Sequence, residues 1–130
     1  MSLNDPLSNV LSQINTYEKT GKKELVTKNN SKIIRKVLSI MQDHKYIGGF
    51  EQIKDSKGSM LRIHLLGSIN KSGAVKPHFS VKKDSFEKFE KRFLPAKDFG
   101  ILIISTSQGM MTHVEAKKKE LGGRLISYCY

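Results

Sequence analysis

Apolar residues recur at steps of three and four in two segments near the start of the chain, which predicts two amphipathic helices. The first helix begins at Pro6, a residue favoured at the first helical position, with Asn4 or Asp5 as its cap, and Gly21 ends it. Ser31 caps the second helix. The two apolar stripes consist of Leu7, Val10, Leu11, Ile14 and Tyr17, and of Ile33, Ile34, Val37, Leu38 and Met41.

Three other segments of the first half have the short or alternating apolar pattern of strands. They cover Glu24–Thr27, Tyr46–Ile53 and Ser59–Leu66. The last two are separated by the turn-forming residues 55–58, DSKG, which predict a hairpin connection. The first half is therefore predicted to run helix, strand, helix, strand, strand.

A concentration of turn-forming residues between Gly67 and Lys76 indicates a hinge or boundary. We place the boundary before Gly67. This predicts an N-terminal part of residues 1–66 and a C-terminal part of residues 67–130.

The second half begins with a short predicted strand at His78–Val81. A helix follows, and Pro95 ends it. Its apolar face consists of Phe86, Phe89, Phe93 and Leu94. The continuous apolar run Ile101–Ile104 is typical of a strand that is covered on both faces.

The C-terminal stretch combines a polar loop, a short helix and a strand. The loop STSQG, residues 105–109, follows the apolar run directly. Thr112 opens a helix with Glu115 as its capping-box partner, and the pair Gly122 and Gly123 ends that helix. From Arg124 to Tyr130, apolar and polar residues alternate in part, which predicts a terminal strand.

These elements predict an α+β fold. In it, an N-terminal α-β-α-β-β subdomain packs against a C-terminal, mainly antiparallel β subdomain with short helices. With 130 residues, the chain has room for one domain or two small subdomains and not for a large multi-domain enzyme.

The charge of the chain is strongly positive. It has 23 Lys and Arg against 12 Asp and Glu, a formal net charge of +11 and a pI near 9.8. Such an imbalance usually accompanies a polyanionic partner, most often a nucleic acid. A membrane surface fits less well, because no segment combines a strongly apolar face with a lysine-rich one. We therefore predict nucleic-acid binding and no membrane contact.

The basic residues gather in two groups, and each group is either a phosphate-binding face or a solvated helix face. Both interpretations stay open for any single lysine. The first group consists of Lys19, Lys22, Lys23, Lys28, Lys32, Arg35 and Lys36, and the second of Lys117, Lys118, Lys119 and Arg124.

Residue types that carry catalysis lack the spacing that catalysis needs. The four histidines do not have metal-ligand spacing, and no glycine-rich nucleotide loop is present. The histidines are His44, His64, His78 and His113. Glu87 with Lys91, and Glu115 with Lys119, are spaced four apart, as in helix-surface ion pairs. We predict a protein without enzymatic activity, cofactor or metal.

Cysteine use and the absence of targeting signals bear on localisation. Cys129 is the only cysteine, which excludes a disulfide within the chain and favours a reducing compartment. No apolar run approaches the roughly 18 residues of a membrane span, and the start of the chain lacks the layout of a signal peptide. The sequence therefore predicts a cytoplasmic protein.

The loop STSQG is the most distinctive polar feature. Hydroxyl and amide groups both donate and accept hydrogen bonds at small volume, so they suit close contact with the shallow minor groove of RNA and its 2′-hydroxyls. Backbone amides at a helix start add donors for phosphate. Without further context, the same residues after a strand are more often turn and capping residues.

A longer run that contains this loop resembles a known family. Residues 103–117, IISTSQGMMTHVEAK, followed by the glycine pair, are similar to the signature of ribosomal small-subunit protein S-eight in its archaeal and eukaryotic form. That signature is a strand, an STS-type loop, a glycine, an MT or MD pair, an EA helix and a GG turn. The resemblance extends over nearly the full length through DPL at 5–7, SK at 31–32, YIG at 46–48, FE at 50–51, LP at 94–95 and FG at 99–100.

The resemblance implies a non-catalytic constituent of the small ribosomal subunit, monomeric when free. Such a protein binds directly to the central domain of small-subunit ribosomal RNA, at a helix with an irregular internal loop, and supports assembly with other small-subunit proteins. Some members also bind a mimic of this site in their own messenger RNA. The candidate RNA-binding residues are Ser105, Thr106, Ser107, Gln108, Gly109, Gly123 and Arg124 in the second half, and Asn15, Lys28, Ser31, Lys32 and Arg35 in the first.

Two other functional classes compete with this interpretation. A small basic nuclease requires a clustered site of His, Lys and Glu and would degrade labelled RNA. A non-specific DNA-compacting protein would bind duplex DNA as well as it binds the ribosomal fragment.

Overall fold

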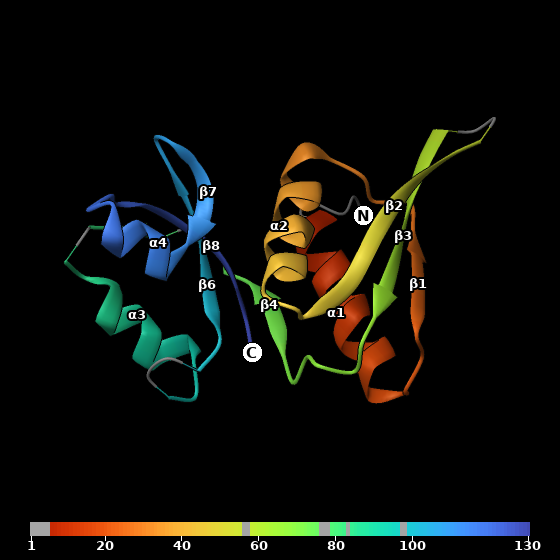
Figure 1. The fold of residues 1–130 in the computed structure, drawn as a ribbon, viewed down its shortest axis with the longest axis horizontal. Coiled ribbons are helices and arrows are strands. Elements are labelled where there is room, and N and C mark those ends of the chain that lie inside the picture. Colours follow the sequence, from red (N-terminus) through yellow and green to blue (C-terminus); the bar gives the residue numbers. More distant parts are fainter. Residues whose placement is uncertain (1–5, 56–57, 76–78, 83, 97–98) are drawn as a thin grey trace, which may run out of the picture. The chain divides into compact units, whose positions relative to one another are not determined.

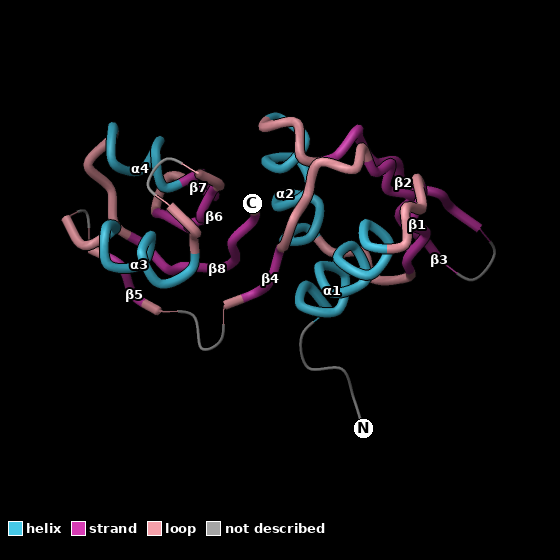
Figure 2. Tube along the Cα trace, turned by 90° about the horizontal axis from the view of Figure 1, so that it is seen from below, coloured by secondary structure: helices cyan, strands magenta, loops and turns pink. Residues whose placement is uncertain are grey.

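A computed structural model of the chain describes residues 6–55, 58–75, 79–82, 84–96 and 99–130. These residues form two compact units, which divide between Ser72 and Gly73, and each unit contains helices and an antiparallel sheet (Figures 1 and 2). The mixed α+β class is as the sequence predicts. The predicted cap residues Asn4 and Asp5, the hairpin residues Ser56 and Lys57, and His78 lie outside the described residues.

The first unit follows the predicted order of elements. It contains α1 (Pro6–Lys19), β1 (Glu24–Thr27), α2 (Lys32–Asp43), β2 (Ile47–Asp55) and β3 (Gly58–Leu65). Strand β3 is central in the sheet order β1-β3-β2, and both of its pairings are antiparallel. Helices α1 and α2 lie on the same face of this sheet (Figure 1). On the opposite face, which we call the open face, the side chains of Glu24, Glu51 and Arg62 are exposed.

The apolar stripes of the two helices form the core of the first unit, with two exceptions. The buried residues are Leu7, Val10, Leu11 and Ile14 in α1, and Ile34, Val37, Leu38 and Met41 in α2. Tyr17 is only half-buried, and the Lys22 ammonium lies 4.9 Å from its ring centroid. Ile33 is 53% exposed. It lies about a quarter turn from the centre of the stripe, so apolar character alone overestimated its burial.

Backbone hydrogen bonds end α1 as the glycine signal predicts. Gly21 has φ +76°, its N–H donates to the carbonyl of Glu18, and the N–H of Lys22 donates to the carbonyl of Tyr17. This is the Schellman pattern, which uses a left-handed residue just after the helix.

Residues 67–72 belong to the first unit, whereas the sequence placed them after the boundary. The Glu18 carboxylate accepts hydrogen bonds from the N–H groups of Gly67 (3.3 Å) and Ile69 (3.0 Å), and the Ile69 side chain is buried. The division of the chain still falls inside the turn-rich stretch between Gly67 and Lys76. The carboxylate of Glu18 on α1 binds this segment to the first unit. Turn propensity is a local property of the sequence and does not predict such a contact.

The second unit is built on a sheet of strand order β4-β8-β6-β7, with β5 also paired to β8. Its elements are β4 (Ser72–Ala74), β5 (Ser80–Val81), α3 (Phe86–Phe93), β6 (Ile101–Thr106), β7 (Gly109–Thr112), α4 (His113–Lys118) and β8 (Gly123–Cys129). The first residue of β4, Ser72, is the last residue of the first unit. Helices α3 and α4 lie on one face of the sheet (Figures 1 and 2). None of the helices that the structure describes is long and apolar enough to cross a lipid bilayer.

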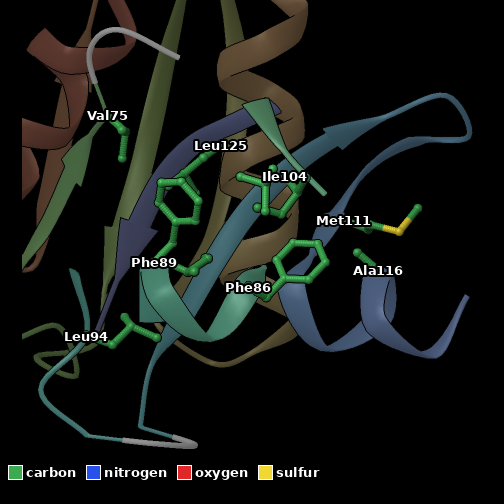
Figure 3. Packing of buried hydrophobic residues seen from close by; sticks show 10 residues of the cluster. Val75, Phe86, Phe89, Leu94, Ile104, Met111, Ala116 and Leu125 are labelled. Atoms are coloured by element: carbon green, nitrogen blue, oxygen red, sulfur yellow. The ribbon is translucent and has the colours of Figure 1, made fainter. Parts of the chain in front are cut away.

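The core of the second unit lies between α3, α4 and the sheet. Phe86 and Phe89 project from α3 toward Ile104 and Leu125 (Figure 3). Phe86 is 1% exposed and Phe89 is 8% exposed. The phenylalanine spacing in the sequence therefore indicates a packing face, as predicted.

Two details of the second unit differ from the sequence interpretation. Strands β4 and β7 were missed, because each is only three or four residues long and rich in glycine or polar residues. Gly122 and Gly123 do not end α4. The helix ends at Lys118, and Glu120, with φ +55°, is the left-handed residue of its C-terminal hydrogen-bond pattern.

We expect the free protein to be folded without a partner, because each unit buries its own apolar residues. Circular dichroism at moderate salt should give a helix and strand spectrum that melts cooperatively. RNA should then add order to surface residues without creating the fold. A coil-like spectrum that becomes structured only when RNA is added would contradict this expectation.

Candidate RNA-binding surfaces

The predicted recognition loop is the tip of a β-hairpin. Ser105 and Thr106 lie in β6 and Gly109 lies in β7, so only Ser107 and Gln108 form the turn. Thr106 pairs with Gly109 across the hairpin. The sequence placed this loop between a strand and a helix, and the difference arises from β7. In Figure 1 the turn of this hairpin projects beyond α4.

The Thr106 side chain closes the turn. Its hydroxyl donates a hydrogen bond to the carbonyl of Gly109 (2.7 Å) and accepts one from the N–H of Gln108 (3.1 Å). Gly109 has φ +113°, a conformation that side-chain-bearing residues rarely adopt. Within the chain, Thr106 and Gly109 therefore act as turn-forming residues.

Ser105, Ser107 and Gln108 differ from Thr106. Ser107 and Gln108 are exposed and Ser105 is half-buried. Among the residues that the structure describes, the side chains of these three make no hydrogen bond to the chain. Their donors and acceptors are therefore free to meet a partner.

Strand pairing places a cation beside Ser105. Ser105 lies opposite Arg124 of β8 and opposite Met110 of β7, and Arg124 lies opposite Ser80 of β5. Directly paired residues project from the same face of a sheet. The adjoining position, Ile104, projects into the core with α3 and α4, so Ser105 and Arg124 share the other face. We call Ser105, Ser107, Gln108 and Arg124 the hairpin surface.

Gly123 allows β8 to approach β6 closely. A Cβ atom added at this position would lie 2.1 Å from the carbonyl oxygen of Ser105 and 3.1 Å from Cγ2 of Ile104. No side chain fits there without displacement of a strand. The structure thus gives Gly123 a steric role directly beneath the hairpin surface.

A second basic surface surrounds the start of α2. Ser31 is its N-cap, and its hydroxyl accepts a hydrogen bond from the N–H of Ile34 (3.3 Å). Lys28, Lys32 and Lys36 are exposed, and none of them pairs with a carboxylate of the described residues. The first turn of α2 contains no acidic residue. Backbone amides at a helix start and nearby lysines both favour an anion.

Arg35 belongs to this surface and is held by a chain of side chains. Its guanidinium donates to the side-chain carbonyl of Asn30, and the Asn30 amide donates to the Ser59 hydroxyl (2.8 Å). Asn30 thus connects α2 to β3. The sequence suggested only a turn at this asparagine, because the two partners are distant in the chain or belong to the next element. We call Lys28, Ser31, Lys32 and Arg35 the helix surface.

Asn15 lies apart from the helix surface and binds the segment that ends the first unit. Its side-chain NH₂ donates to the carbonyl of Ser72 (2.6 Å), and its carbonyl accepts from the Ser72 N–H (2.8 Å) and hydroxyl (3.0 Å). Asn15 therefore holds Ser72 at the end of the first unit, and its contact with RNA stays a prediction.

Several cations are already paired with carboxylates. On the open face of the first sheet, Nε of Arg62 lies 2.8 Å from Oε1 of Glu24, and Nη1 of Arg62 lies 3.9 Å from Oε1 of Glu51. In the second basic group, the Lys117 ammonium donates to the buried carboxylate of Glu90. This leaves Lys118, Lys119 and Arg124 as the exposed members of that group that pair with no carboxylate of the described residues, since Lys117 is exposed as well but is paired.

The helix-surface ion pairs expected from spacing form in one case. Glu87 and Lys91 approach to 3.7 Å. Within the described residues no ion pair joins Glu115 to Lys119; instead the Lys119 N–H donates to the Glu115 carbonyl. In the same part of the chain, no three His, Cys, Asp or Glu side chains gather into a group that could hold a metal ion.

Comparison with known families agrees with the architecture. The family model described as Ribosomal protein S8 matches residues 5–130, which include both units from α1 to the end of β8. A match of this extent includes the elements that carry the hairpin surface and those that carry the helix surface. The chain therefore belongs to the ribosomal protein S8 family, whose members are structural proteins of the small ribosomal subunit.

Proposed function

We propose that this small-subunit protein binds the central domain of small-subunit ribosomal RNA directly and supports its assembly, as a monomer when free. The observation that carries the proposal is the hairpin surface. It combines side chains of Ser105, Ser107 and Gln108 that are unpaired among the described residues with the guanidinium of Arg124 on neighbouring strands. Small donors and acceptors beside a cation suit an RNA site that offers 2′-hydroxyls, base edges and phosphates together.

The helix surface contributes in a different way. Lys28, Lys32 and Arg35 are cations that can neutralise phosphates and so position the RNA, without reading its sequence. Arg35 is held in place by Asn30, so less side-chain entropy is lost when it binds. In this proposal the hairpin surface recognises the shape of the RNA, and the helix surface attracts its phosphates.

Binding of the protein's own messenger RNA is a further part of the proposal. A surface that reads an irregular RNA shape would accept any RNA that presents the same internal loop. A messenger fragment with such a loop should therefore compete with the ribosomal fragment for the same hairpin residues.

We expect affinity for a central-domain fragment to fall steeply as salt rises. If about five to eight phosphates are neutralised, the slope of log K against log salt should be about −4 to −7. Replacing Lys28 and Lys32 with glutamine should make the slope shallower by nearly one unit for each lysine that contacts phosphate. Arg62→Gln is the matched control, because Arg62 is already paired with two carboxylates.

Filter binding or calorimetry at four salt concentrations gives these slopes. A slope near zero for the unmodified protein would overturn the electrostatic part of the proposal. The same preparation separates the competing classes: cleavage of labelled RNA with or without magnesium supports a nuclease, and equal affinity for duplex DNA supports a DNA-compacting protein.

A further inference from the structure

A carboxylate is buried within the apolar face of α3. Glu90 is 5% exposed and lies at the same helix face as Phe86, four residues before it. A buried carboxylate requires polar partners, because loss of its hydration is otherwise uncompensated. Two side chains of α4 supply them: the Lys117 ammonium donates to Glu90 Oε1, and His113 Nε2 lies 3.5 Å from the same oxygen.

His113 in turn holds the backbone of β6. The residue is 1% exposed, and its Nδ1 accepts a hydrogen bond from the N–H of Leu102 (3.1 Å). A ring nitrogen that accepts a hydrogen bond carries no proton, so the proton of the ring is on Nε2 and faces Glu90. The polar chain therefore runs from β6 through His113 to α3.

The hydrogen bond between Leu102 and His113 lies just beyond the last residue pair of β6 and β7. The pairing of β6 with β7 ends at Ile103 and Thr112, so Leu102 and His113 occupy the next position. There the chain turns from strand to helix, with Thr112 as the N-cap of α4. The imidazole of His113 takes the N–H of Leu102 that a longer β7 would bond through its backbone. A side chain thus completes the strand ladder where the backbone leaves it.

We infer that His113 and Glu90 are positioning residues for RNA recognition by the hairpin surface. His113 fixes the point at which β7 ends and α4 begins, and Glu90 fixes the orientation of the His113 ring. The four residue pairs of β6 with β7, from Ile103–Thr112 to Thr106–Gly109, lie between this anchor and the turn. Loss of the anchor should let the hairpin twist or shift, so that Ser105 and Ser107 no longer meet the RNA together. The inference rests on the proposed function of the hairpin surface.

An ordinary stabilising role for this polar chain predicts different results. If these contacts only join α3 to α4, their loss should lower the melting temperature and leave the RNA affinity of the folded protein unchanged. A positioning role lowers the affinity of folded protein well below its melting temperature and leaves the salt slope unchanged, because no phosphate contact is lost.

Two substitutions at His113 separate the functions of its ring. In His113→Asn the side-chain carbonyl lies close to the place of Nδ1 and can still accept the Leu102 N–H, whereas His113→Leu removes both polar contacts. We expect His113→Leu to weaken binding of the central-domain fragment about tenfold, and His113→Asn to retain affinity within about threefold. Amide exchange at Leu102, Ile104 and Met111 should be faster in His113→Leu, with exchange in α2 unchanged.

A double-mutant cycle adds a measurement that stability alone does not affect. Replacing Ser105 and Ser107 with alanine should reduce affinity much less in the His113→Leu protein than in the unmodified protein, because the hairpin is already displaced. If His113→Leu does not fold, Glu90→Gln takes its place in the cycle, since it keeps the volume and removes the charge. Full affinity, or strictly additive losses, in whichever of these variants folds would overturn the inference.

Failure of the inference is distinguishable from failure of the proposed function. If Ser105→Ala/Ser107→Ala binds normally in the otherwise unmodified protein, the hairpin is not the RNA-reading surface and both proposals fall. If that variant loses affinity and the His113 variants do not, only the positioning role is wrong.

Discussion

Alanine at both Ser105 and Ser107 is expected to reduce affinity for the central-domain RNA fragment by tens to thousands of fold. Each hydroxyl that leaves a buried polar group of the RNA unpaired should cost about 1–3 kcal/mol. The melting temperature should hardly change, because neither hydroxyl bonds to another described residue of the chain. The salt slope should also be unchanged, since hydroxyls displace no counterions. Titration at fixed salt with a melting curve of the same preparation measures both quantities.

Thr106→Ala is the matched control for this variant. The Thr106 hydroxyl bonds to the carbonyl of Gly109 and to the N–H of Gln108, so its loss should lower stability by about 1–2 kcal/mol. A double replacement of Thr106 and Ser107 would mix the two effects. If Ser105→Ala/Ser107→Ala binds with the affinity of the unmodified protein, the loop is turn chemistry alone and the hairpin assignment should be withdrawn.

Alanine at Gly123 is expected to destabilise the protein by about 3 kcal/mol, at the upper end of overpacking effects. The added methyl group would lie 2.1 Å from the Ser105 carbonyl oxygen, and a backbone atom cannot move aside as a side chain can. Strand β8 must therefore separate from β6 near the hairpin. Denaturant unfolding measures the loss, and the RNA affinity of the protein that remains folded should fall because Ser105 moves.

Gly21→Ala provides the comparison for Gly123→Ala. Its Cβ would meet no atom within 4 Å, so only the left-handed backbone at φ +76° opposes the substitution, with a cost of about 1–2 kcal/mol. Equal stability of the Gly123→Ala and Gly21→Ala proteins would contradict the close approach of β8 to β6.

Periodicity in the sequence was sufficient for the long elements of both units. Helices α1, α2 and α3 and strands β1, β2, β3 and β6 lie where the apolar pattern places them, because each buries a regular stripe or face. Strand β7 was missed, since GMMT has too few β-branched residues to signal a strand. Its existence depends on pairing with β6, which a local pattern does not contain.

The candidate site was predictable as a set of residues but not as interactions. Thr106 and Ser107 are alike in sequence, yet one hydroxyl closes the turn and the other is exposed. Lys117 resembles its neighbours Lys118 and Lys119 until the buried carboxylate of Glu90 is found beside it. A signal for Glu90 was present: it lies four residues after Phe86, on the apolar face of the predicted helix. Its partners lie on another helix, and only the fold brings them together.

The ion pairs on the open face of the first sheet affect how this unit meets RNA in solution. Exposed pairs such as Arg62 with Glu24 and Glu51 add little stability. They do cancel the cation on that face, whereas Lys28, Lys32 and Lys36 stay uncompensated around the start of α2, on the face that the helices cover. Between these two faces, the unpaired positive charge therefore lies beside the start of α2 and not on the open face of the sheet. A polyanion that approaches should rotate the unit so that α2 faces it before contact, which raises the fraction of collisions that lead to binding.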